Sequence, residues 1–208
     1  MPDARTRAFG QEYRPTLVDE FGVWLSARQI RRSVGHTLGS WQGRRIGDFG
    51  CGFHAAFART VLDQVDNAVL IDVALADDLK AHPRVTAIEA RLPDAFSAVP
   101  DASLDVAMCV SVIEHLSDPL AGLTQLRRVL RSGGVCLINV PTWRGKWFLE
   151  TSAFRLGLSP REEMDDHKMY YDPRDLWPLL VRAGFVPHAI QVFRHKFGLN
   201  TFAVCRNN

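Results

Sequence analysis

The stretch Ile46-Gly47-Asp48-Phe49-Gly50-Cys51-Gly52-Phe53-His54-Ala55 decides the fold. It overlaps a predicted strand, 45–49, and opens a predicted helix over 55–62. Glycines at such a turn let backbone N–H groups approach a ligand closely, and the helix N-terminus favours a negative group. Asp72 lies 20 residues after Gly52, at the end of the next predicted strand, where a carboxylate can accept both hydroxyls of a ribose. The pattern therefore predicts a cofactor site at the carboxyl end of a parallel sheet.

Two classes of cofactor fit this pattern. The spacing Gly50-x-Gly52-x-x-Ala55 matches the dinucleotide fingerprint of NAD(P)-dependent oxidoreductases, but the sequence shows no obvious substrate domain for such an enzyme. Asp48 favours S-adenosylmethionine, because a carboxylate just before the glycines can receive the ammonium group of that methyl donor. The plainer interpretations are that the glycines only shape a tight turn and that Asp72 caps a helix.

Short apolar runs that alternate with helical patterns predict an α/β domain. The first 43 residues form a mainly helical N-terminal segment, and residues 44–208 form one domain with an insertion at about 141–171. A helix that starts at Asp118-Pro119 should end at Gly133-Gly134, and the helix that starts at Asp172-Pro173 should be kinked by Pro178 or begin later. The expected strands are 45–49, 68–72, 85–88, 104–110 and 135–140, followed by a hairpin of 185–197 and 201–205.

Composition excludes several classes of protein. The chain has 208 residues, 47% of them hydrophobic, and a net charge of only +2, which does not indicate a nucleic-acid partner. The four cysteines lie far apart in the sequence and read as buried free thiols in a reducing compartment. Residues 1–10 lack the apolar core of a secretory signal, and no apolar run reaches membrane-spanning length. We therefore expect a soluble, cytoplasmic protein without membrane insertion.

The order and spacing of six motifs resemble the class I S-adenosylmethionine-dependent methyltransferases, in the group called methyltransferase type 11 or ubiquinone-biosynthesis-like. The resemblance runs from about residue 45 to 205, roughly three quarters of the chain. It implies a Rossmann-like, seven-stranded, mostly parallel sheet with helices on both faces and a C-terminal antiparallel hairpin. The motifs are Asp48-Phe49-Gly50-Cys51-Gly52, Leu70-Ile71-Asp72, Ala102-Ser103-Leu104-Asp105-Val106, Val112-Ile113-Glu114-His115-Leu116-Ser117-Asp118-Pro119, Leu130-Arg131-Ser132-Gly133-Gly134 and Ala183-Gly184-Phe185.

The resemblance also implies which residues bind S-adenosylmethionine. Asp72 would hold the ribose. The chain departs from the family pattern at His54, where many relatives have a third glycine, and at Glu89-Ala90, which only loosely matches the usual acidic-plus-small pair beside adenine. The other implied cofactor-binding residues are Asp48, Gly50, Cys51 and Gly52 at the methionyl portion, Glu89 and Ala90 at the adenine, and Ser111 and Val112 under the sulfonium.

His115 is the first candidate for a catalytic residue, because it follows the fourth strand and its ordinary pKa suits proton transfer from a hydroxyl. The equal alternative is that His115 hydrogen-bonds the sheet edge or orients the cap. His167, in the acidic stretch 162–168, is the second candidate. That stretch could hold a divalent cation, but a solvated charged face is favoured and no metal is expected. Substrate contacts are expected from Trp143, Arg144, Tyr170 and Tyr171, although the aromatic and basic side chains at 143–147 could equally form a hydrophobic cap.

These features predict methyl transfer from S-adenosylmethionine to a small or carbohydrate-like acceptor, with O-methylation of a sugar hydroxyl favoured. The preference for a sugar acceptor is based on the C-terminal stretch Arg194-His195-Lys196-Phe197-Gly198-Leu199-Asn200. This stretch looks similar to methyltransferases of bacterial polysaccharide biosynthesis. The alternatives are an NAD(P)-dependent oxidoreductase and a non-catalytic binding module whose methionyl pocket is blocked by His54. Aromatic side chains in the first 43 residues leave room for a homodimer contact.

Overall fold

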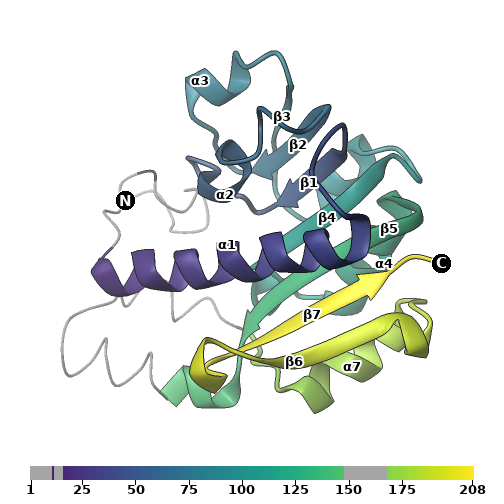
Figure 1. Ribbon diagram of the computed structural model, residues 1–208. Helices are drawn as coiled ribbons and strands as arrows, with labels where there is room; N and C mark the ends of the chain where they lie inside the picture. The colour runs from purple at the N-terminus through teal and green to yellow at the C-terminus, as the bar shows by residue number, and fades with distance from the viewer. Residues whose placement is uncertain (1–10, 12–15, 148–167) are drawn as a thin grey trace.

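The computed structural model describes residues 11, 16–147 and 168–208, which form a single sheet covered by helices (Figure 1). The seven strands have the order β3-β2-β1-β4-β5-β7-β6. Neighbouring strands are parallel from β3 to β5, and β7 runs antiparallel to both β5 and β6. The predicted mostly parallel Rossmann-like sheet with a terminal hairpin is confirmed. The strands are β1 Arg45–Phe49, β2 Asn67–Asp72, β3 Val85–Glu89, β4 Leu104–Val110, β5 Leu130–Pro141, β6 Ile190–His195 and β7 Asn200–Arg206.

Helices cover both faces of this sheet (Figure 1). On one face, Ile30 and Val34 of α1 join the apolar cluster of Ile46 and Phe202. On the other face, α4 and α7 pack against the opposite sides of the same strands. The described α-helices are α1 Leu17–Leu38, α2 Ala56–Arg59, α3 Asp77–Lys80, α4 Pro119–Val129 and α7 Pro173–Arg182, and the 3-10 helices are η2 Asp94–Ala98, η3 Ile113–His115, η4 Pro187–Ala189 and η5 Lys196–Gly198.

Helix α4 begins as expected and ends early. The Asp118 side chain accepts a hydrogen bond from the Ala121 backbone N–H at 2.9 Å, and proline occupies the first turn. The predicted end at Gly133 is wrong, because the helix stops at Val129. Leu130 is buried and already pairs with Leu104 of β4, so the main chain is extended before the glycines are reached.

Two further expectations at the C-terminal part are corrected. Helix α7 starts at Pro173 with a capping box between Asp172 and Asp175, so the later start is wrong, while the kink at Pro178 stays a prediction. The first strand of the hairpin is shorter than the predicted 185–197. Pro187 begins η4 before it, and positive φ angles at Lys196 and Phe197 turn the chain after His195.

Three further observations bear on the predictions of a dimer contact, of membrane insertion and of free thiols. Phe21 and Trp24 of α1 stack with ring centroids 5.8 Å apart, and each is about half exposed. In the described ranges, no helix combines the length and the apolar character that crossing a membrane requires. All four cysteines are free, as expected; Cys109, Cys136 and Cys205 are buried, whereas Cys51 is only partly buried.

Candidate functional site

The glycine-rich turn joins the carboxyl ends of β1, β2 and β4. The Gly50 and Cys51 backbone N–H groups donate to the Ile71 carbonyl at 2.8 and 3.2 Å, which pins the turn to the end of β2. Gly50 has φ +78°, and a Cβ atom there would lie 2.3 Å from Cγ2 of Val112. Only glycine therefore allows the turn after β1 to approach the loop after β4 this closely.

Asp72 closes the same turn from the end of β2. Its Oδ2 accepts the Gly52 N–H and its Oδ1 accepts the Val73 N–H, both at 2.8 Å. It does not cap the next helix, since Ala76 occupies the N-cap of α3. Each carboxylate oxygen retains a second lone pair that can accept a ligand hydroxyl.

Asp48 gives the turn its unusual electrostatics. The side chain is almost fully buried in β1, and burial, together with the neighbouring Asp72 carboxylate, raises the pKa of Asp48 to about 7. Burial also raises the pKa of Asp72. Burial and both carboxylates raise the pKa of the Cys51 thiol, so Cys51 lines the site as a neutral group. A buried carboxyl whose charge is further destabilised by a neighbouring carboxylate favours a bound cation, such as the ammonium group of S-adenosylmethionine.

The carboxyl end of β3 continues this edge. Glu89 pairs in register with Asp72, and the Ala90 N–H donates to the Asp72 carbonyl at 3.0 Å. Glu89 Oε1 accepts the Leu75 N–H at 2.8 Å and lies 3.4 Å from Nζ of Lys80. The predicted ribose and adenine residues thus lie side by side.

The loop after β4 holds the residues predicted under the sulfonium. Ser111 has φ +56°, and its N–H donates to the Asn139 carbonyl of β5 at 2.8 Å. Val112 lies against Gly50, and His115 follows in η3, half-buried, with its N–H donating to the Val112 carbonyl at 2.9 Å. His115 is therefore placed one short turn from the contact between the two loops.

Glu114, in the same loop, is a candidate site residue that the sequence did not single out. Its side chain is fully buried, and neither carboxylate oxygen has a hydrogen-bond partner in the described part of the chain. Burial raises the pKa of Glu114 to about 8, against smaller opposing effects of the Glu114 backbone N–H and of the Lys196 charge. The available signal in the sequence was a carboxylate between apolar residues directly after a buried strand.

The predicted substrate residues are divided between surface and interior. Trp143, Arg144 and Trp147 are exposed, and Trp143 packs on the buried Tyr170 with ring centroids 5.5 Å apart. Tyr171 is buried, and its N–H donates to the carbonyl of Pro141 at the end of β5.

The two other histidines of the sequence analysis have different outcomes. His167 and the acidic stretch up to it lie outside the described residues. His54 is exposed, with its ring edge-on to Phe53.

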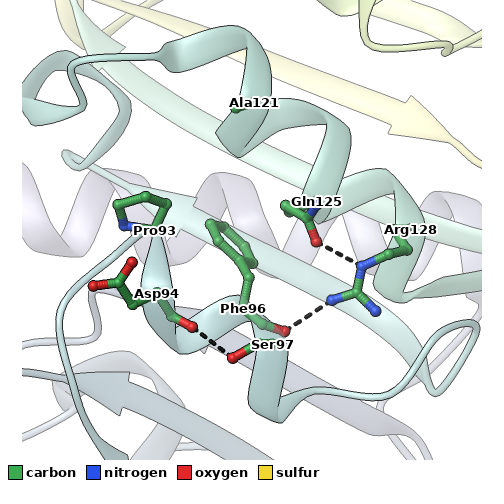
Figure 2. Close-up of a pocket in the computed structure, with 7 residues that line it drawn as sticks. All are labelled: Pro93, Asp94, Phe96, Ser97, Ala121, Gln125 and Arg128. Carbon is green, nitrogen blue, oxygen red and sulfur yellow. Dashed lines mark hydrogen bonds between the residues drawn. The ribbon is translucent and has the colours of Figure 1, made fainter.

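A separate hollow of about 540 Å³ lies between η2 and α4 (Figure 2). Arg128 crosses it and donates to the Phe96 carbonyl at 2.8 Å and to Gln125 at 2.6 Å. None of the predicted site residues lines this hollow.

Comparisons with known proteins agree with this geometry. A family model described as a methyltransferase domain matches residues 21–190. A probable S-adenosylmethionine-dependent methyltransferase of Mycobacterium tuberculosis is 30% identical over 152 residues, which cover 71% of this chain and 50% of that protein. The chain therefore spans about half the length of that relative.

Two further similarities extend the comparison. A ubiquinone biosynthesis O-methyltransferase of Paracidovorax citrulli is 28% identical, with 70% of this chain and 65% of that protein covered. The crystal structure of an S-adenosylmethionine-dependent methyltransferase from Archaeoglobus fulgidus shares the fold, with a TM-score of 0.59, 14% identity, and coverage of 92% of this chain and 100% of that one. This chain belongs to the family of S-adenosylmethionine-dependent methyltransferases.

Proposed function

We propose that the protein transfers a methyl group from S-adenosylmethionine to a hydroxyl oxygen of a small, carbohydrate-like acceptor. The observation that carries this proposal is the cradle formed by Asp48, Gly50, Gly52 and Asp72, which faces the loop after β4 across the contact between Gly50 and Val112. S-adenosylmethionine, when bound, supplies a methyl group on a sulfonium with a good leaving group. The chain must therefore align the acceptor, exclude water and accept a proton.

Different residues of the cradle would contact different parts of the cofactor. Asp48 and Cys51 would line the site of the methionyl ammonium, and the two glycines would bring their backbone close to the ligand. Asp72 would accept the ribose hydroxyls with the lone pairs that its backbone partners leave. Glu89 and Ala90 would flank the adenine, and Ser111 and Val112 would lie under the sulfonium.

The acceptor side favours an oxygen nucleophile. His115 lies in the loop next to the contact between Gly50 and Val112. We propose that His115 accepts the proton of the acceptor hydroxyl, with His167 as the alternative base. The relative from Paracidovorax citrulli is named as an O-methyltransferase, which supports the same chemistry here. Trp143 and Trp147 offer exposed aromatic faces for a sugar ring, and Arg144 adds charge beside them. A role in bacterial polysaccharide biosynthesis is part of this proposal.

Calorimetric titration with S-adenosylhomocysteine, NAD and NADP tests the cofactor first. We expect binding of S-adenosylhomocysteine alone. Preference for a nicotinamide cofactor would favour an oxidoreductase, and binding of none would favour a module that retains only the fold.

Variants of the two histidines then test the base. His115→Ala should lower kcat for methyl transfer about 10²–10⁴-fold and remove the acidic limb of its pH profile, while the affinity for S-adenosylhomocysteine stays unchanged. If His167→Ala produces this effect instead, the base is His167. If neither variant alters turnover, both assignments are wrong.

The homodimer remains a prediction that sedimentation can test. The exposed stack of Phe21 and Trp24 would lie in the contact. Replacing both with Ser should then convert a dimer to a monomer, and a wild-type monomer would contradict the prediction.

A further inference from the structure

Two fully buried polar side chains near the end of β4 and β5 have unpaired acceptor atoms. Both carboxylate oxygens of Glu114 and Oδ1 of Asn139 are without a hydrogen-bond partner among residues 16–147 and 168–208. Both residues have a relative exposure of 0%. A buried polar atom without a hydrogen-bond partner lowers the stability of the folded protein. Several such atoms at one edge of the sheet therefore indicate that a ligand pairs with them.

Asn139 and the neighbouring His195 lie under the N-terminal half of α1. Asn139 Nδ2 donates to Ser26 Oγ at 3.2 Å. The ring of His195, at the end of β6, forms a backbone hydrogen bond with Leu25, while its Nε2 is buried and unpaired. A Cβ atom on Gly22 would lie 3.6 Å from Nζ of Lys196. Residues 22, 25 and 26 share one face of α1, so the polar ends of β5 and β6 meet the same stretch of helix (Figure 1).

The same cluster adjoins the proposed site of methyl transfer. Ser111, which follows β4, donates its N–H to the carbonyl of Asn139 itself. Glu114 is three residues further along this loop, and the charges of Glu114 and Lys196 influence each other's pKa. The unpaired atoms therefore border the loop that holds Val112 against Gly50.

The chemistry of these atoms restricts the ligand. Asn139 uses its amide NH₂ group toward Ser26, which leaves the carbonyl oxygen as an acceptor. The Glu114 carboxyl also offers acceptor lone pairs, whatever its protonation state. A matching molecule must bring at least two hydrogen-bond donors, and adjacent hydroxyl groups on a ring supply them in a fixed geometry.

We propose that Glu114 and Asn139, flanked by His195 and Lys196, hydrogen-bond two neighbouring hydroxyl groups of the acceptor and so select a polyhydroxylated ring over a molecule with a single hydroxyl. The assignment rests on the proposed methyl transfer to a hydroxyl and adds the residues that choose the acceptor. His115 keeps its separate role toward the reacting hydroxyl.

Binding measured on the full chain tests the assignment. The Tm of the protein saturated with S-adenosylhomocysteine is measured in the presence of one of four polyols: methyl α-D-mannopyranoside, methyl α-D-glucopyranoside, methyl α-L-rhamnopyranoside or myo-inositol. The same measurement is made with a compound that has a single hydroxyl, cyclohexanol or phenol. At least one of the four polyols should raise the Tm, and the two single-hydroxyl compounds should not. The variants are Glu114→Met and the pair Ser26→Ala with Asn139→Leu, which removes both ends of the buried hydrogen bond. In each variant, the polyol concentration that gives half of the maximal rise in Tm should be at least tenfold higher than in the wild type.

The ligand-free variants provide a second readout. An apolar side chain in place of an unpaired buried polar group should leave Tm unchanged or raise it by about 2–4 °C. Gln191→Leu, at an exposed amide on β6, is the matched control and should alter neither Tm nor binding. A fall in the ligand-free Tm of both variants would show that Glu114 and Asn139 have a structural role, supported by water, and would overturn the proposal.

The remaining outcomes separate this assignment from the proposed function. Failure of all four polyols to bind, or an unchanged polyol response in the variants, overturns the assignment. Methyl transfer to phenol without polyol binding overturns it too, but leaves O-methylation intact. Binding of a polyol that accepts no methyl group supports the assignment and contradicts O-methylation of that polyol.

Discussion

Replacement of Asp48 with asparagine should make the protein more stable and less able to bind its cofactor. Asp48 is buried in β1 beside the Asp72 carboxylate, and burial raises its pKa to about 7. Ionisation of Asp48 therefore costs more free energy in the native state than in the unfolded chain. Asparagine keeps the shape and removes the charge, so the variant escapes this penalty while losing the group that would receive a ligand ammonium.

The size of the effect follows from the pKa shift. A raised native pKa means that the native state binds more protons than the unfolded state between the two pKa values, so wild-type stability falls as the pH rises from about 4 to about 7. A change from the ordinary value of 3.8 to about 7 corresponds to about 4 kcal/mol at most. The advantage of Asp48→Asn should therefore be about 2 kcal/mol at pH 5 and about 4 kcal/mol at pH 8.

Urea unfolding at pH 5, 6.5 and 8 measures this difference directly, and titration with S-adenosylhomocysteine measures the functional loss. Wild-type affinity should rise as the pH passes through 7, because the ligand ammonium selects ionised Asp48, whereas the variant should bind weakly at every pH. Glu114→Gln is the matched control, since it removes another buried carboxyl without touching the cofactor site. The reasoning is refuted if Asp48→Asn is less stable than wild type at pH 8, or if its advantage does not change with pH.

Other variants probe the close approach of the loops and the separate hollow. Gly50→Ala should cost about 2–5 kcal/mol, because overpacking against Val112 (about 1–3 kcal/mol) adds to the cost of the positive φ (about 1–2 kcal/mol), and it should abolish cofactor binding; calorimetry with S-adenosylhomocysteine checks this. Gly133→Ala, with a similar φ of +77° but no atom within 4 Å, should cost only about 1–2 kcal/mol and leave binding intact. Equal effects of the two changes would contradict the steric argument. Arg128→Met should cost about 2–3 kcal/mol in thermal or urea unfolding, because the partly buried carbonyls of Phe96 and Val99 each lose a hydrogen bond from the guanidinium. A loss of cofactor affinity in that variant would link the hollow of Figure 2 to the site.

Much of the fold could be predicted because its signals are local. The strand Leu104–Val110 was predicted to the residue, since a continuous apolar run in a parallel sheet is buried on both faces. The end of α4 was missed for a non-local reason. Leu130 leaves the helix because it pairs with Leu104, 26 residues away, and no feature within the helix itself announces that pairing.

The site divides in the same way. Gly50, Gly52 and Asp72 could be predicted as neighbours because a strand, a tight turn and the next parallel strand place them together in any fold of this kind. Glu114 and Asn139 could not, since they come from different elements and are brought near each other by the hydrogen bond from the Ser111 N–H to the Asn139 carbonyl, while Ser26 of α1 orients the Asn139 amide. Their shared property is an unpaired atom, which exists only in the folded protein.

The two buried carboxyls on either side of the Gly50–Val112 contact should respond to their ligands in opposite ways. An ammonium beside Asp48 stabilises the ionised carboxylate, so cofactor binding should release a proton near pH 7. Glu114, whose pKa burial raises to about 8, is mostly protonated at neutral pH and can meet neutral hydroxyl groups without burying a charge. Cofactor binding should therefore strengthen with rising pH through 7, whereas polyol binding should retain its strength there. Isothermal titrations in buffers of different ionisation enthalpy count the protons released, and proton release on polyol binding rather than on cofactor binding would invert these roles.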